Sequence, residues 1–214
     1  MSNKLVLCIQ RKEIEKIFEG NIPIGFSVSV DYFNKVAKCF SEKGKFLLRE
    51  EVENDETILQ AIVYGVVSDG SRVLGLWRKQ RVSIDGQFKE TRHNNKIGLA
   101  AGGHLELTDM FGDQQYYDHE ILREFSEELV FQIPPKPVPV GIVMYEETVF
   151  DKVHLGLIYK VLVSAEKVGL APNNDEYEQC NFLLPSKLQE LRDHMEGWGK
   201  VIADAIISGA FSLR

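Results

Sequence analysis

Apolar residues along this chain recur at two spacings, and each spacing predicts one type of secondary structure. Apolar runs rich in β-branched and aromatic residues predict strands, at residues 4–10, 46–49, 60–68, 72–77, 97–101, 138–144, 153–163 and 180–184. Spacings of three and four predict helices, at residues 11–18, 31–43, the second half of 102–131, 185–194 and 196–207. Strands flank a central helix and helices close the chain, which indicates an α/β fold.

Several residues mark where these elements begin, turn or end. Asp69-Gly70 separates two predicted strands and favours a tight hairpin. Asp31 is a suitable N-cap for the second helix, and Gly44 is a suitable end. In the last helix we expect Trp198 to lie on the buried side.

A polar loop at residues 83–96 follows the hairpin. Its basic residues, with the two at the end of the preceding strand, are Lys79, Arg81, Lys89, Arg92, His93 and Lys96. Such clusters are usually solvated loops, but they also bind phosphate. Arg81 and Arg92 are therefore candidate substrate-binding residues, with a solvated loop as the alternative.

The central helix carries glutamates on one face and apolar residues on the other. At 100° per residue, Glu120, Glu124, Glu127 and Glu128 share one face. Like charges one turn apart repel each other, and a pair between Arg123 and Glu127 relieves only part of this repulsion. A divalent cation would relieve the rest, because such carboxylates are suitable ligands for Mg²⁺ or Mn²⁺. The alternative is an ordinary solvated face.

A Gly-Gly turn precedes this helix, and the turn and the helix together form a longer sequence pattern. Residues 103–109 read GHLELTD, residues 123–128 read REFSEE, and Phe131 follows. This resembles the signature of the Nudix hydrolases, G-x5-E-x7-R-E-U-x-E-E-x-G-U, where U is apolar. The sequence departs from it in three ways: a spacer of 13 residues, Asp109 in place of Glu, and Val130 in place of Gly.

The resemblance implies a fold and a division of the chain. We expect a Nudix-like α/β/α sandwich with a mixed β-sheet, in which residues 58–214 form the Nudix domain. Residues 1–57 would be an N-terminal α/β extension packed on the core, because their apolar residues need a partner surface. Core completion is the favoured role. The alternatives are a dimer contact, which would make the protein a homodimer, or closure of one side of the substrate pocket.

The resemblance also implies an activity that depends on Mg²⁺ (or Mn²⁺). Members of the family cleave a nucleoside diphosphate linked to another group X, with water attacking phosphorus and metal ions activating the water. Carried over by position, the metal ligands would be Glu124, Glu127, Glu128 and Asp109. Gly103 would keep its loop close to the metal and the substrate.

The same resemblance suggests catalytic roles. Arg123 would orient a glutamate, and Glu127 or Glu128 would help to deprotonate water. In several relatives a further glutamate outside the motif is the base. Here Glu178 is the candidate we retain, and Glu176 and Glu147 are not excluded.

Composition limits the class of partner and the compartment. A net charge of −7 on 214 residues argues against general nucleic-acid binding, but allows a small phosphorylated substrate. The three cysteines are far apart and indicate neither zinc nor disulfides. We see no signal-peptide layout and no apolar stretch of the ~18 residues that span a membrane. A cytoplasmic setting without membrane contact is expected.

Two other functions follow from the same resemblance. The long spacer and Val130 allow a catalytically weak or inactive module that senses a nucleotide. An isopentenyl-diphosphate isomerase-like enzyme would use the same fold, but it should show a catalytic cysteine motif that this sequence lacks. The intact R-E-x-x-E-E favours the diphosphate hydrolase.

Overall fold

Strand β4 (Ile58–Ser68) is the centre of the fold, and all eleven of its residues are buried. The structure, a computed structural model, describes residues 4–80, 95–113 and 115–214. The other strands are β1 (Leu5–Gln10), β2 (Gly25–Val28), β3 (Lys45–Leu48), β5 (Val73–Arg78), β6 (Ile97–Gly98), β7 (Ala101–His104), β8 (Leu129–Phe131), β9 (Val138–Met144), β10 (His154–Leu162), β11 (Val168–Leu170) and β12 (Tyr177–Leu183). The helices are α1 (Arg11–Glu15), α2 (Val30–Lys43), α3 (Arg49–Val52), α4 (Tyr116–Glu128), α5 (Val149–Lys152), α6 (Pro185–Leu191) and α7 (Gly197–Ile207), with short 3-10 turns at Lys16–Phe18, Ala165–Lys167 and Arg192–His194.

The main sheet has the strand order β12-β5-β4-β10-β9-β2. β10 runs parallel to β4, whereas β9 and β10, β5 and β12, and β1 and β4 pair antiparallel. Along one edge, β4 pairs in turn with β1, β7 and β5. β8 and β11 form a separate small sheet. The mixed sheet confirms the prediction.

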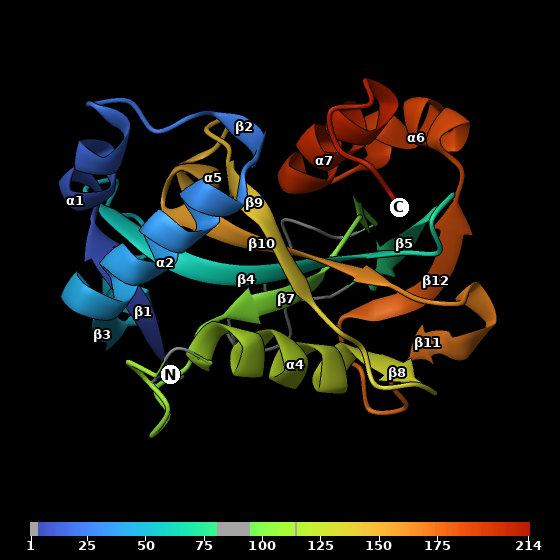
Figure 1. The fold of residues 1–214 in the computed structure, drawn as a ribbon, viewed down its shortest axis with the longest axis horizontal. Coiled ribbons are helices and arrows are strands. Elements are labelled where there is room, and N and C mark those ends of the chain that lie inside the picture. The colour runs from blue at the N-terminus through green and yellow to red at the C-terminus, as the bar shows by residue number, and fades with distance from the viewer. Residues whose placement is uncertain (1–3, 81–94, 114) are drawn as a thin grey trace.

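Helices cover both faces of this sheet. On one face Phe33 of α2 meets Tyr159 of β10 edge to face, with ring centroids 5.0 Å apart. On the same face, Phe125 of α4 fills the space that a side chain at Gly65 would take. On the other face α6 and α7 pack on a second apolar cluster. α4 and α7 therefore lie on opposite sides of the central strands (Figure 1), and the predicted α/β/α sandwich is confirmed.

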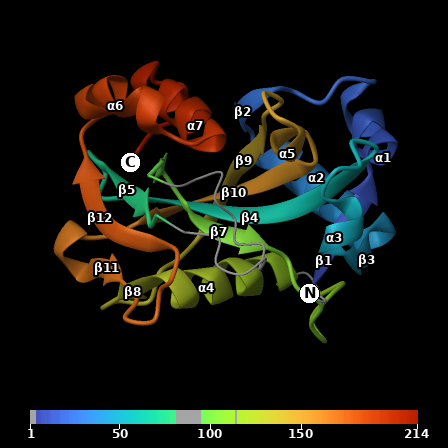
Figure 2. The same cartoon turned by 180° about the vertical axis from the view of Figure 1, so that it is seen from behind.

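The first 57 residues add strands to the same sheet. β1 pairs with β4 and β3, and β2 pairs with β9. β1, β3 and α3 gather at the end of the molecule away from α6 (Figure 2). The boundary at residue 57 remains a prediction, but the residues before it are joined to the sheet by backbone hydrogen bonds.

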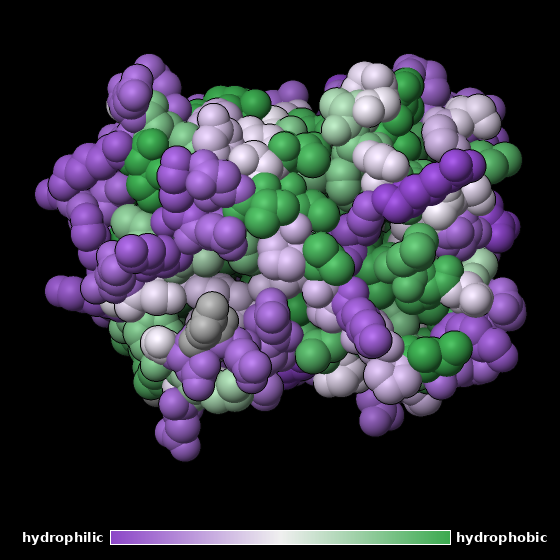
Figure 3. Space-filling view, viewed as in Figure 1, coloured by the Kyte–Doolittle hydropathy of each residue, from purple (hydrophilic) through white to green (hydrophobic). Residues whose placement is uncertain are grey.

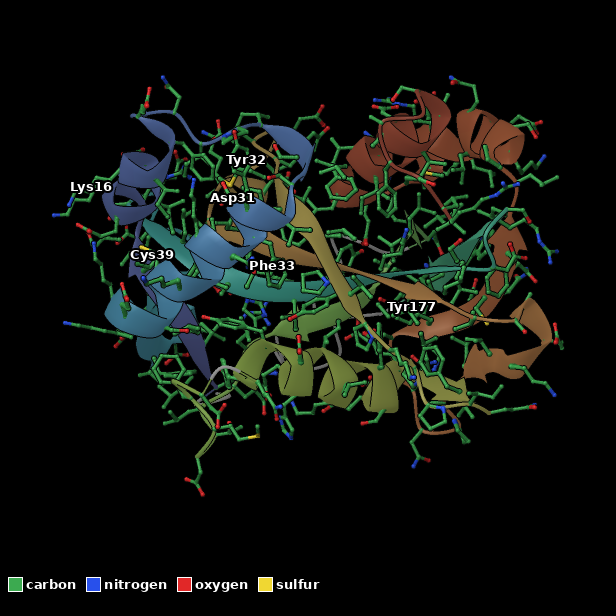
Figure 4. All side chains as sticks on the ribbon, viewed as in Figure 1. Lys16, Asp31, Tyr32, Phe33, Cys39 and Tyr177 are labelled. Atoms are coloured by element: carbon green, nitrogen blue, oxygen red, sulfur yellow. The ribbon has the colours of Figure 1, made fainter. Side chains whose placement is uncertain are left out.

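Three local predictions were wrong in detail. Ser29, not Asp31, caps α2: its Oγ accepts from the Tyr32 amide at 3.2 Å, while Asp31 points away from the sheet and pairs with Lys35 (Figure 4). The predicted strand at 97–101 is split into β6 and β7, so Gly102-Gly103 lies inside a strand. The predicted strand at 46–49 ends at Leu48, and Arg49 begins helix α3.

The surface seen in Figure 3 is polar over much of the side where α1 and α2 lie, and apolar residues form patches elsewhere on that face. Asp31 and Lys16 are among the outward-pointing charged residues on this side (Figure 4). Over the ranges that the structure describes, no helix combines the length and the apolar character needed to cross a membrane.

Asp69 stabilises the predicted hairpin between β4 and β5. Its carboxylate accepts from the Ser71 and Arg72 amides at 2.9 and 2.7 Å. Burial raises the pKa of Asp69, but these bonds outweigh it and lower the pKa to about 2. A lowered pKa means that the stabilisation is present above about pH 4 and is lost as pH falls toward 2.

Asp69→Asn should therefore lower the free energy of unfolding by about 1–2 kcal/mol at pH 6. At pH 2 the difference in unfolding urea concentration should be much smaller, because about half of the native-state Asp69 carboxyls are then protonated. Urea unfolding at both pH values tests this. A difference that is equal at pH 6 and pH 2 would contradict it.

Candidate functional site

A cavity of about 310 Å³ is lined by residues of α4, β7, β4 and the start of α7. Side chains from distant parts of the chain line it. The carboxylates among them are Glu124, Glu127, Glu128, Asp151, Asp175, Glu176 and Glu196. The basic side chains are Lys4, Arg49, Arg78 and Lys79. With the histidines neutral, these described side chains carry a formal charge of −3.

Helix α4 delivers three of these carboxylates together. Its apolar side, with Ile121 and Phe125, is buried in the core. Burying that side turns Glu124, Glu127 and Glu128 toward the cavity. Glu124 and Glu128 are buried, whereas the Glu127 side chain is more than half exposed. The glutamate face predicted from the sequence is thus a cavity wall rather than a fully solvated face.

Arg123 pairs with several carboxylates at once. Its Nη1 donates to Glu127 at 2.8 Å, and its Nη2 donates to Glu124 at 2.6 Å and to Glu120 at 3.0 Å. Nη2 also donates to the carbonyl of His104 at 3.1 Å, which ties α4 to β7. Arg123 therefore holds two of the three candidate metal ligands and the strand beside them.

Glu120 is a site residue whose role the sequence did not predict. It is completely buried. Besides Arg123 it accepts from the Glu106 amide at 3.0 Å, and Tyr116 donates to the Glu106 carbonyl at 2.6 Å. Glu120 and Tyr116 thus fix the start of the long spacer against α4. The helical spacing placed Glu120 on the acidic face, but only the pairing of β7 with β4 shows that it is enclosed.

Two glycines allow α4 to lie this close to the strand. The Gly102 amide donates to Glu128 at 2.9 Å. The φ of Gly102 is +150°, and a Cβ there would lie 2.1 Å from the Val63 carbonyl oxygen. A Cβ at Gly103 would lie 2.7 Å from a carboxylate oxygen of Glu124. Only glycine fits at either position without displacing the neighbours.

Burial makes two of the carboxylates unusually easy to protonate. Burial raises the pKa of Glu124 to about 7, against the opposing effect of Arg123 and, more weakly, Lys4. Burial also raises the pKa of Glu128 well above its usual range, and Arg78 opposes this. The nearby positive charges thus offset the desolvation of these two carboxylates only in part.

The chemistry of these donors fits a divalent cation. Carboxylate oxygens are the ligands that Mg²⁺ and Mn²⁺ prefer, and Glu124, Glu127 and Glu128 line one cavity. As they stand, the described residues present no group of three or more His, Cys, Asp or Glu side chains arranged to hold a metal. The pairs that Arg123 makes with Glu124 and Glu127 would have to adjust on binding.

Near Glu128, a network surrounds Arg78. Arg78 pairs with Glu176 and, at 3.3 Å, with Glu196, and it lies over the Tyr177 ring at 4.7 Å. Tyr64 donates to Glu196 at 2.6 Å. Glu196, at the start of α7, was not singled out from the sequence. The only sign of Glu196 in the sequence is that it is a charged residue before an apolar helix.

On the side of Glu124, two buried histidines meet. Nε2 of His104 lies 3.1 Å from Nε2 of His154 and 2.9 Å from Oε1 of Gln60. Burial and then His154 lower the pKa of His104 well below its usual range, and Arg49 and Lys4 add to this. His104 is therefore neutral at pH 7. Both histidines line the cavity.

The structure does not bring every predicted site residue to the cavity. Asp109 is exposed in the loop after β7 and is not among the residues that line the cavity. Glu178 is exposed on β12, and Glu147 is exposed near Lys200. Glu176, two residues before Glu178, does line the cavity. β12 begins earlier than predicted, which places these two residues differently.

Other predictions concern residues at the rim or beyond the described ranges. Arg81 and Arg92 lie outside the described residues. Lys79, from the same basic group, lines the cavity. Trp198, expected on the buried side of the last helix, packs against the second apolar cluster and also lines the cavity, with its ring centroid 5.4 Å from that of Tyr64. An apolar spacing cannot tell a core position from a cavity wall.

Comparison with known proteins finds matches in structure but not in sequence. No protein-family profile and no curated protein matches the chain. Tm1382, named a putative Nudix hydrolase, superposes with a TM-score of 0.75 and 25% identity over 96% of this chain and 99% of that one. A Nudix hydrolase from Nitrosomonas europaea superposes with a TM-score of 0.51 and 13% identity over 72% of this chain and 91% of that one.

The match to Tm1382 extends over nearly the whole of both chains, and so includes most of the first 57 residues. The more distant match shows the fold alone. Within that fold, the R-E-x-x-E-E sequence lies on α4 and faces the cavity. The chain therefore has the fold of the Nudix hydrolases, and its similarity to Tm1382 over nearly the whole of both chains supports a pyrophosphohydrolase enzyme.

Proposed function

We propose that this protein is a Mg²⁺-dependent hydrolase that cleaves the diphosphate linkage of a nucleoside diphosphate derivative. The observation that carries the proposal is the wall of α4, where three carboxylates of the R-E-x-x-E-E sequence face one cavity. A diphosphate is itself negatively charged, and the cavity lining is negative before it enters. Bound cations would remove this repulsion, and Mn²⁺ would serve as Mg²⁺ does.

Glu124, Glu127 and Glu128 would hold the ion. When bound, Mg²⁺ would neutralise phosphate charge and lower the pKa of a coordinated water. Arg123 acts through the glutamates that it orients and does not line the cavity itself. The glycines of β7 keep the strand backbone within hydrogen-bonding reach of Glu128.

Glu176 is the best-placed candidate for the general base among the glutamates considered outside the motif. It lines the cavity, whereas Glu178 and Glu147 do not. Arg78 pairs with Glu176 and lowers the pKa of Glu128, while Glu176 raises it. Glu176 therefore lies on the same side of the cavity as the proposed metal ligands. A base must be able to reach the attacking water within the cavity.

The alternative functions have less support. A cysteine-dependent isomerase needs a thiol at the site, and no cysteine is among the described residues that line the cavity. A nucleotide sensor stays the second candidate, because the spacer and Val130 still depart from the signature. Asp109 as a ligand, the substrate contacts of Arg81 and Arg92, a cytoplasmic setting and a homodimer remain predictions.

Glu127→Gln should abolish Mg²⁺-dependent turnover and leave the melting temperature nearly unchanged, because the side chain is mostly exposed. The substrates to screen are nucleoside triphosphates, nucleotide sugars, ADP-ribose, NADH, dinucleoside polyphosphates and coenzyme A, each with Mg²⁺ and with Mn²⁺. Full activity of the variant would refute the site. No turnover by wild type, with a ligand still raising the melting temperature, would favour the sensor.

Glu176→Gln and Glu178→Gln form a matched pair for the base. We expect Glu176→Gln to lower kcat about 10²–10⁴-fold and Glu178→Gln to leave kcat unchanged. Both variants should be checked for folding by thermal unfolding, since Glu176 also pairs with Arg78. A large loss in Glu178→Gln alone would restore the sequence-based choice.

Gly103→Ala should displace the Glu124 carboxylate, because the new methyl group would lie 2.7 Å from it. A shift of this size in a catalytic group should lower kcat/KM about 10–100-fold. Gly169→Ala is the control, since a Cβ there meets nothing within 4 Å. Equal activity of the two variants would show that Gly103 does not position Glu124.

A further inference from the structure

The two arginines that line the cavity have different surroundings. Arg78 pairs with Glu176 and Glu196 and lies over an aromatic ring, so protein groups balance its charge. Arg49 Nη2 donates to Glu53 at 3.3 Å. Its Nε is buried and has no hydrogen-bond partner among the described residues. Arg49 thus lines the cavity and retains a donor that the protein does not use.

A buried donor without a partner costs free energy, and native proteins leave few of them. An acceptor supplied by a ligand would satisfy Arg49 Nε. The guanidinium carries its donors in a planar fork that matches the oxygens of a phosphate. The unused donor therefore points to an anionic ligand group at this position.

Lys4 adds a second positive charge at the same end of the cavity. The Arg49 amide donates to the Lys4 carbonyl at 3.0 Å, so the backbones of the two residues are adjacent. Lys4 Nζ lies 2.9 Å from Glu106, which places it beside the loop from β7 to α4. Both residues come from the first 57, and both line the cavity.

This basic pair lies on a different side of the acidic wall from Arg78. Lys4 pairs with Glu106, just after β7, whereas Arg78 pairs with Glu176 before β12 and with Glu196 before α7. A diphosphate held by the α4 carboxylates would lie between the two basic regions. A substrate group that extends past Glu124 would meet Lys4 and Arg49.

We propose that Arg49 and Lys4 bind a further phosphate group of the substrate, outside the scissile diphosphate. The N-terminal segment then determines specificity, because it selects derivatives in which X or the nucleoside carries an additional phosphate. The substrate assignment rests on the proposed hydrolase function. Phosphate binding by the two side chains does not require hydrolysis, so the two can be tested separately.

The first experiment is a titration of the full chain with inorganic phosphate in EDTA, followed through the ¹H–¹⁵N signal of Arg49 Nε. We expect a saturable shift of this signal, with the dissociation constant raised about tenfold by Lys4→Gln. Lys79→Gln removes a cation from the opposite side and should leave the titration unchanged. No saturable shift, or equal effects of the two variants, would overturn the proposal.

The second experiment uses the substrate that wild type hydrolyses. Arg49→Gln should raise its KM at least tenfold with kcat unchanged, and Arg49→Lys should recover part of the affinity. An unchanged KM in Arg49→Gln would overturn the assignment to substrate. If wild type hydrolyses nothing while phosphate still shifts the Arg49 signal, the hydrolase function fails and the anion site stands.

Discussion

The ion pairs of Arg123 are the interaction on which the candidate site depends. α4 places four glutamates near one another, and two of them are buried in the wall of the cavity. Without a cation among them this arrangement would be strongly unfavourable. Arg123 contacts three of the four and also the His104 carbonyl, so one guanidinium both compensates the charge and holds α4 against β7.

Arg123 does not remove all the cost of burying the glutamates of α4. Arg123 does not pair with Glu128, whose burial favours the neutral form. Glu124 is likewise protonated more easily than a solvated carboxyl. Oxygen donors in this state bind a divalent cation in exchange for protons. The low dielectric constant that makes burial of these carboxylates costly would also strengthen their interaction with a metal-bound diphosphate.

The rest of the cavity is assembled from segments that are distant in the sequence. β4 pairs with β1, β7 and β5 along one edge, which brings the first residues of the chain next to the glycines of β7. From the opposite direction, the start of α7 contributes Glu196 and Trp198. The N-terminal segment and the last helix are therefore parts of the cavity and not additions to a finished core.

The sequence by itself determined the periodic elements and the identity of the acidic wall, because apolar spacing is local and R-E-x-x-E-E lies within one helix. It could not place Asp109, Glu176 or Glu178 relative to the cavity, because loop direction and strand limits depend on pairing with distant strands. It could not show that Glu120 is enclosed or that Arg49 has an unused donor. Burial and hydrogen-bond satisfaction are properties of the packed chain, and only the tertiary structure decided them.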